Sequence, residues 1–181
     1  MKKGLFLSLI CFALTHVYAQ QEQWTLNAED SQISYAAKHL LHPWEGVNKK
    51  VKAVLKMDAD LKKITELAVL TLVRDYDSKN TGRDAHALEV LEALSYPDVR
   101  FYADAFTAIN DSLQIDGTLL FHGVSKPLSV IAHLKQDKKQ WTLSGGFRIQ
   151  PTHFGVALPS FMMVKMDDEL RFTYRLTFDK P

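Results

Sequence analysis

Apolar and polar residues alternate along most of this chain with the period of two that is typical of half-buried β-strands. The clearest run is residues 170–178, where leucine and aromatic side chains alternate with arginine and threonine. Residues 64–73 are instead apolar on both faces, which favours a strand that is covered on its outside. The pattern predicts strands over residues 33–37, 51–57, 64–73, 99–105, 113–121, 128–134, 141–149 and 170–178.

Short turns connect most of these segments, which favours antiparallel pairing of neighbours. The prolines at positions 43, 97, 127, 151 and 159 respect the pattern, because they fall at segment edges. Residues 84–94 differ, since Leu88, Leu91 and Leu94 have helical spacing behind Asp84, a good N-cap. The sequence therefore predicts an all-β fold, an eight-stranded antiparallel barrel with one short helix capping an end.

Small residues recur on the inward-facing rows of the predicted barrel. These are Ala37, Ala53, Ala103, Gly117, Ala132 and Gly145, and the strand 99–105 also turns Val99, Phe101 and Ala105 inward. An eight-stranded barrel is just wide enough for its own side chains or for one small ligand. The small residues leave room for a ligand, or they alternate with phenylalanine and leucine to fill a closed core. The pattern alone leaves both open.

The first residues predict export. A basic start, an apolar stretch from Leu5 to Leu14 and the sequence Val17-Tyr18-Ala19 indicate a signal peptide over residues 1–19. The apolar stretch is too short to span a bilayer. We expect one mature domain over residues 20–181, located in the periplasm or secreted.

The single cysteine and the charge balance narrow the options further. Cys11 lies inside the predicted signal peptide, so we expect a mature domain without disulfides. Removing Lys2 and Lys3 changes the formal net charge from +1 to −1. A balanced chain of this kind has no basic footprint for nucleic acid, and no later segment is long and apolar enough for a transmembrane helix.

Four motifs carry a resemblance to a known family. They are Ser31–His39 followed by Gly46, Arg83-Asp84-Ala85-His86-Ala87-Leu88 followed by Tyr96–Phe101, Gly117–Leu128, and the weaker Phe147-Arg148-Ile149 leading to His153-Phe154-Gly155. In this order and spacing the chain resembles the YceI-like proteins, bacterial periplasmic lipocalin-like barrels. The resemblance covers essentially the whole mature chain.

The resemblance implies a pocket for a polyisoprenoid, an isoprenoid quinone or a fatty-acid-like chain, with no cofactor beyond such a bound lipid. The inward residues that we expect to touch this ligand are Tyr35, Ala37, Ala53, Leu55, Phe101, Ala103, Leu119, Phe121, Val130, Ala132, Leu143, Phe147, Phe172 and Tyr174. The chain departs from the family at His42–Glu45 and at Pro151-Thr152-His153. The family's head-group preference is therefore not carried over.

Four residues are candidates for contact with a ligand head group: His39, Arg83, His86 and His153. Arg83 and His86 are able to donate hydrogen bonds to a carbonyl or a carboxylate. We favour a structural role for this motif, in which Asp84 caps the helix and Arg83 pairs with a strand carboxylate.

Metal and catalytic chemistry find little support in the sequence. The nearest histidine pair, His39 and His42, is three residues apart at a strand end, where side chains point to opposite faces. No serine elbow exists, and the carboxylates at 75–77 and 167–169 lie between predicted strands. We expect neither a metal site nor an enzyme.

The leading hypothesis is a carrier or store for a long apolar molecule. Two alternatives stay open: a filled barrel whose surface, including Trp44, docks an envelope partner, and a metal- or haem-linked redox accessory that uses the histidines. A homodimer is also left open.

Overall fold

The computed structural model of the chain describes residues 21–40, 42–161 and 163–181. The predicted signal peptide lies outside these residues. The strands are β1 (Gln21–Leu26), β2 (Gln32–His39), β3 (His42–Asn48), β4 (Lys52–Asp58), β5 (Lys63–Leu72), β6 (Asp98–Ile109), β7 (Ser112–Phe121), β8 (Val124–Gln136), β9 (Gln140–Ile149), β10 (Ser160–Phe161), β11 (Val164–Lys165) and β12 (Leu170–Asp179). One α-helix, α1 (Thr81–Val90), and two short 3₁₀ helices, η1 (Val73–Asp75) and η2 (Pro151–Phe154), interrupt them.

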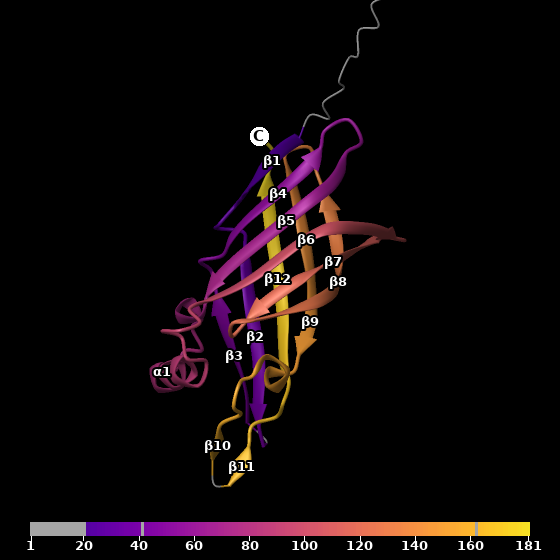
Figure 1. Cartoon of the computed structure of the whole chain (residues 1–181). Helices are drawn as coiled ribbons and strands as arrows, with labels where there is room; N and C mark the ends of the chain where they lie inside the picture. Colours follow the sequence, from indigo (N-terminus) through magenta and orange to yellow (C-terminus); the bar gives the residue numbers. More distant parts are fainter. Residues whose placement is uncertain (1–20, 41, 162) are drawn as a thin grey trace, which may run out of the picture.

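Eight strands form a closed antiparallel barrel (Figure 1). Their order is β1-β4-β5-β6-β7-β8-β9-β12, and the ring closes where β1 pairs with β12 through Thr25 opposite Asp179 and Leu26 opposite Phe178. The predicted fold class, an eight-stranded barrel with one short helix, is confirmed. Within the described chain, no helix is long and apolar enough to span a membrane.

The first two walls of the barrel are interrupted strands. β1 continues into β2 after a break, and β3 continues into β4, so that β1 pairs with β4 and β2 pairs with β3. Asn48 fixes the second break from the inside, since its side chain donates to Leu72 O (3.4 Å) and accepts from Lys50 N (2.7 Å). The alternation pattern did not predict β1 and β3, because charged residues and a proline interrupt it there.

A β-bulge in β6 changes which residues of this strand face the core. The pairing of β6 with β7 shifts between Ala103 and Ala105, so that Asp104 is an extra residue in its strand. Ala103 is completely buried, but Ala105 is exposed and Phe106 packs against the core instead. The prediction that Ala105 faces inward was wrong, because one inserted residue reverses the face of everything after it.

The helix begins earlier than predicted. Asn80, not Asp84, is the N-cap, and its side chain accepts a hydrogen bond from Arg83 N at 2.9 Å. The helix ends at Val90, so Leu94 lies in the following loop and is fully exposed. An asparagine with extended backbone dihedrals is as good a cap as an aspartate, and this one precedes the predicted start by four residues.

Two of the prolines lie inside strands, contrary to the prediction. Pro43 is the second residue of β3, and Pro127 is the fourth residue of β8. β8 pairs with β9 only from Ile131 onward, so Pro127 has a ladder neighbour on one side alone. A missing N–H is tolerated where one strand edge has no partner.

One end of the barrel interior is filled. Trp24 and Trp141 pack with their ring centroids 5.2 Å apart, and Leu55, Leu143 and Phe178 beside them are completely buried. This packed end lies near the C-terminus of the chain, at the top of Figure 1. Here the barrel holds its own side chains and has no space for a ligand.

The packed end predicts how a large residue is tolerated there. We expect Ala103→Trp to lower the free energy of unfolding by about 1–3 kcal/mol or more, because it overpacks a filled core. Asp104→Trp, on the exposed bulge residue next to it, should change this free energy by about 0.5 kcal/mol or less. Denaturant titration of both variants tests this. Equal midpoints for Ala103→Trp and the unmodified protein would contradict the packed end.

Candidate functional site

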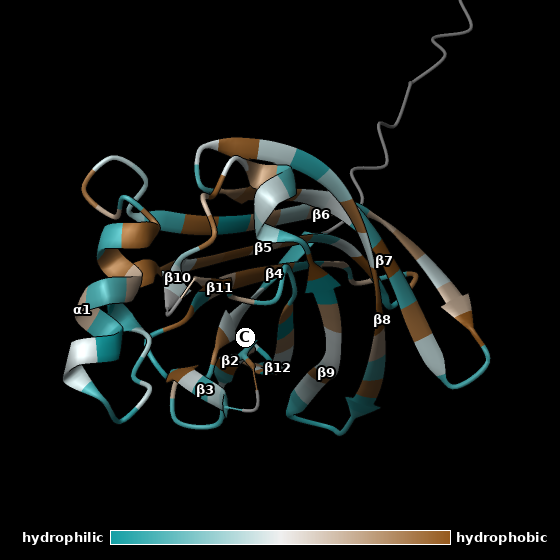
Figure 2. Cartoon of the chain, turned by 90° about the horizontal axis from the view of Figure 1, so that it is seen from below, coloured by the Kyte–Doolittle hydropathy of each residue, from teal (hydrophilic) through white to brown (hydrophobic). Residues whose placement is uncertain are grey.

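An apolar cavity of about 140 Å³ lies at the other end of the barrel, where α1 contributes to its lining. Figure 2 views the barrel from this end, with α1 at the left. We call this cavity the outer chamber. Its walls come from the barrel strands, from the segment that carries η1 and α1, and from the chain around η2. The lining residues are Tyr35, Ala37, Trp44, Val73, Arg74, Tyr76, Arg83, Asp84, His86, Ala87, Leu88, Val90, Leu91, Val99, Phe121, Pro151, Val156, Pro159, Met166, Leu170 and Phe172.

A second cavity of about 70 Å³ lies deeper, between the outer chamber and the packed end. This inner chamber is almost entirely apolar. Its lining residues are Ile33, Leu67, Val69, Thr71, Tyr76, Val99, Phe101, Ile115, Leu119, Phe121, Leu128, Val130, Phe147, Ile149, Phe172, Tyr174 and Leu176. Four residues line both chambers, so the two adjoin and form one interrupted apolar space.

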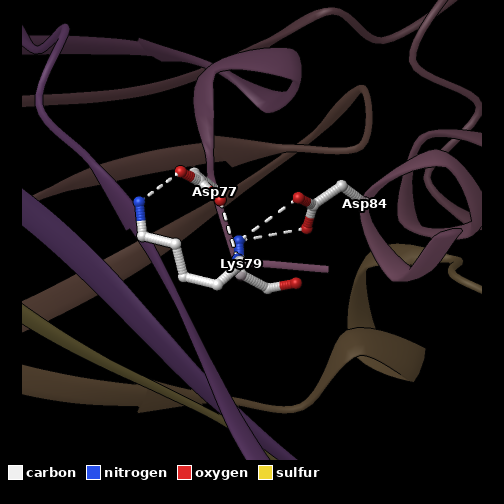
Figure 3. Close-up of polar contacts among 4 residues, drawn as sticks. Asp77, Lys79 and Asp84 are labelled. Atoms are coloured by element: carbon white, nitrogen blue, oxygen red, sulfur yellow. Dashed lines mark hydrogen bonds and ion pairs between the residues drawn. The ribbon is translucent and has the colours of Figure 1, made fainter. Parts of the chain in front are cut away.

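Polar contacts fix α1 across the mouth of the outer chamber (Figure 3). The Asp84 carboxylate in the first turn of α1 accepts from Ser78 N at 3.1 and 3.3 Å. Asp77 accepts from Lys79 N and from Lys79 Nζ, both at 2.7 Å. The backbone of Asp77 also pairs with Val47 in β3 through two hydrogen bonds of 3.0 Å. These contacts turn Ala87, Leu88 and Leu91 toward the barrel interior.

A second set of contacts joins the far end of the helical segment to η2. The buried His122 ring lies 3.0 Å from Glu92 Oε2 through Nε2 and 3.1 Å from Phe154 O through Nδ1. Tyr96 packs on the same ring with centroids 4.5 Å apart. His122 therefore links the two non-strand segments that cover the outer chamber.

Two tyrosines meet at the boundary between the chambers. The rings of Tyr35 and Tyr76 contact edge to face with centroids 5.6 Å apart, and the Tyr76 hydroxyl lies 3.3 Å from Thr71 Oγ1. Gly46 opposite Tyr35 has no room for a side chain, because a Cβ there would lie 2.9 Å from Tyr35 Cζ. Burial raises the pKa of Tyr35, and it raises the pKa of Tyr76 to about 12.

Arginine supplies the positive charge of the outer chamber. Arg83 stacks over the Trp44 ring at 5.4 Å, a cation–π contact, and Arg74 also lines the wall. Within the described chain no carboxylate forms an ion pair with either guanidinium. His86 also lines the chamber, but its side chain is largely exposed and lies 3.5 Å from Glu89.

The fourteen residues expected to touch the ligand divide between the two ends of the barrel. Those in the chambers are Tyr35, Ala37, Phe101, Leu119, Phe121, Val130, Phe147, Phe172 and Tyr174. The others, Ala53, Leu55, Ala103, Ala132 and Leu143, line neither chamber. They belong to or pack against the filled end, where the two tryptophans occupy the interior.

The four head-group candidates also divide. Arg83 and His86 line the outer chamber, whereas His39 and His153 line neither. The His39 ring lies 2.8 Å from Val164 O, which ties the end of β2 to the β10–β11 hairpin. His153 is exposed on η2.

The prediction that His39 and His42 point to opposite faces was wrong. His39 and His42 lie directly opposite each other across the β2–β3 turn, not on opposite faces of one strand. The chain reverses between them, so spacing along a single strand does not apply. Among the described residues, no cluster of three or more histidine, cysteine or acidic side chains could hold a metal ion.

Sequence reasoning missed several lining residues. Trp44 was not predicted as a lining residue because β3 was not predicted. Tyr76 was not predicted because it lies between Asp75 and Asp77, in a segment with the composition of a solvated acidic turn. An aromatic residue between two aspartates is the one signal that could have marked Tyr76 as a buried position.

Comparisons with known proteins give a consistent result. A family model described as YceI-like domain matches residues 24–178. Two proteins named Protein YceI, from Salmonella newport and Escherichia coli O6:H1, are each 24% identical over 140 residues, covering 74% of this chain and 73% of theirs.

Solved structures share the fold. Burkholderia cenocepacia BcnA superposes with a TM-score of 0.75 at 20% identity, over 84% of this chain and 98% of that one. A polyisoprenoid binding domain from Saccharophagus degradans superposes with a TM-score of 0.69 at 10% identity, over 87% and 98%. At these identities the likeness establishes the barrel architecture.

The raised tyrosine pKa values predict alkaline unfolding. Burial raises the pKa of Tyr76 and of Tyr174 to about 12, above their unfolded value of about 10. Their contribution to stability is therefore complete below pH of about 10 and is lost as the pH rises through about 12. We expect Tyr76→Phe and Tyr174→Phe to flatten the fall in melting temperature over this range. Tyr102→Phe, at an exposed tyrosine, should leave the fall unchanged, and an equal effect of all three would contradict the assignment.

Proposed function

The chain belongs to the YceI-like family, and on that premise we propose that it binds one long apolar molecule inside the barrel and carries or stores it outside the cytoplasm. The observation that supports this proposal is the pair of adjoining apolar chambers beneath α1. Polyisoprenoid, isoprenoid quinone and fatty-acid-like chains have the required chemistry. The predicted signal peptide over residues 1–19 supports a periplasmic or secreted location.

The arrangement of the cavity suits a chain. The outer chamber of about 140 Å³ adjoins the inner chamber of about 70 Å³, so a chain that enters at the mouth reaches the second chamber through the first. Each methylene removed from water contributes about 0.8 kcal/mol, so apolar burial alone supplies most of the affinity.

The charge at the mouth supports an acidic or carbonyl head group. Arg83 is half-buried, and its guanidinium offers five donors in a planar fork that fits a carboxylate or a phosphate. Trp44 holds the guanidinium in place from one face, which leaves its edge free for a ligand. We place the head group beside Arg83 and Arg74, with the apolar chain pointing into the barrel.

A head group beside Arg83 changes our interpretation of the Arg-Asp-x-His motif at residues 83–86. Asp84 is not the expected N-cap, which is Asn80, but it supports the start of α1 by accepting from Ser78 N. Among the described residues Arg83 forms no ion pair with a strand carboxylate, contrary to the expectation, and we take its guanidinium to be available to a ligand. In this proposal Asp84 supports the helix and Arg83 binds the head group.

Two alanines on α1 provide a matched test of the cavity. Ala87 lines the outer chamber, whereas Ala85 on the same helix is exposed and lines neither chamber. We expect Ala87→Trp to weaken the binding of palmitic acid at least about tenfold, because the indole occupies ligand space, while Ala85→Trp binds as the unmodified protein does. Displacement of an apolar fluorescent dye measures the affinities, and melting curves confirm folding.

Native mass spectrometry of the protein exported by its own host complements this test. We expect a bound lipid in the unmodified protein and in Ala85→Trp, and little in Ala87→Trp. Equal loss of lipid in both variants, or no binding of any apolar chain to the unmodified protein, would sink the proposal.

The head-group assignment has its own test. Arg83→Gln should weaken the binding of dodecanoic acid about tenfold or more, because a charge-assisted hydrogen bond contributes about 1.5–3 kcal/mol. The binding of dodecanol, which has the same chain without the charge, should change little. Arg175→Gln, on the exposed face of β12, serves as the charge control. A parallel loss of the acid and the alcohol would show that Arg83 shapes the cavity instead.

A further inference from the structure

The two chambers meet at a ring of four side chains: Tyr76, Val99, Phe121 and Phe172. Three of these residues belong to the strands β6, β7 and β12, whose backbones are held by the barrel ladder on both sides. Tyr76 is different, because it lies between η1 and α1 and outside every strand. It is the member of the ring whose side chain reaches the boundary from the segment that covers the barrel end.

The contacts of Tyr76 place its ring across the passage. The ring meets Tyr35, a wall residue of the outer chamber, at 5.6 Å, and its hydroxyl lies 3.3 Å from Thr71 Oγ1 in the wall of the inner chamber. The backbone of the next residue, Asp77, is fixed by its two hydrogen bonds to Val47. The ring therefore has a fixed base in the covering segment and a tip that touches the deep wall.

We propose that the Tyr76 ring divides the apolar space and sets the length of chain that the barrel accepts. This inference rests on the proposed function and names Tyr76 as the residue that limits the length of the bound chain. A chain that enters beside Arg83 fills the outer chamber of about 140 Å³ until it meets the Tyr76 ring. The inner chamber of about 70 Å³ is reached only when that ring is displaced or removed.

The Tyr76 hydroxyl is held by a weak contact. The Tyr76 aromatic ring is therefore the side chain at the boundary that moves most easily. Its hydroxyl contact at 3.3 Å is longer than the usual distance between two hydroxyl oxygens. The two barrel phenylalanines at this boundary are nearly completely buried: Phe121 is 3% exposed and Phe172 is 7% exposed. Shortening Tyr76 opens the passage, whereas shortening a barrel residue also disturbs the wall.

The experiment measures affinity against chain length. Octanoic, decanoic, dodecanoic, tetradecanoic and hexadecanoic acids displace an apolar dye from the unmodified protein and from Tyr76→Leu and Tyr76→Ala. In the unmodified protein we expect affinity to rise about fourfold per methylene while the chain fills the outer chamber and to level off before hexadecanoic acid. In Tyr76→Ala the rise continues, and hexadecanoic acid binds at least about tenfold tighter than in the unmodified protein. Tyr76→Leu lies between them.

Tyr102→Ala is the matched control, because Tyr102 is 47% exposed on β6 and lines neither chamber. Its length profile should follow that of the unmodified protein. A rise that continues to hexadecanoic acid in the unmodified protein would overturn the inference and leave the proposed function standing. This outcome needs no variant, so the test survives even if Tyr76→Ala fails to fold. If no acid of any length displaces the dye, the proposed function fails and the inference fails with it.

Discussion

The barrel depends on β12, the last long strand of the chain. One edge of β12 pairs with β9 along the whole of Leu170–Asp179. The other edge pairs with β2 through residues 171–175 and with β1 at residues 178 and 179. Because β12 thereby joins the first and the last parts of the sequence, no free edge remains in the ring of eight strands and the interior is enclosed.

The two ends of the enclosed interior are closed in different ways. At the end near the C-terminus, Trp24 and Trp141 fill the space, so the core is closed by side chains of the strands themselves. At the opposite end the cover is a separate segment, residues 73–97, which is attached to the barrel by few contacts, such as the two backbone hydrogen bonds between Asp77 and Val47 and the contact of Glu92 with His122. Opening the packed end would instead break the barrel ladder. The helical end therefore opens with fewer broken contacts.

The sequence predicted the barrel well because alternation is a local property. Each of the eight long runs became a wall, since a period of two with polar residues outside has one stable placement in a closed sheet. The failures share a different cause, which is that they depend on contacts between distant segments. The bulge at Asp104 is defined by the partner strand β7, and the start of α1 was decided by Asn80, one of several residues that could cap it. β3 exists because β2 pairs with it despite Pro43.

The position of the cavity could not be predicted, because most of the small inward residues, Ala37 excepted, lie next to aromatic rings or in the filled end and not in the chambers. A Cβ on Gly145 would lie 2.7 Å from the Tyr174 hydroxyl, and a Cβ on Gly117 would lie 2.8 Å from Phe101 Cζ. Each glycine thus accommodates an aromatic side chain of an adjacent strand, and Ala103 lies in the filled end. Free space lies instead at the end where the covering segment, and not side chains of the strands, closes the barrel. Its walls are set by Trp44, Tyr76 and the inner face of α1, three features that no periodic pattern reveals and that only the closed barrel brings together.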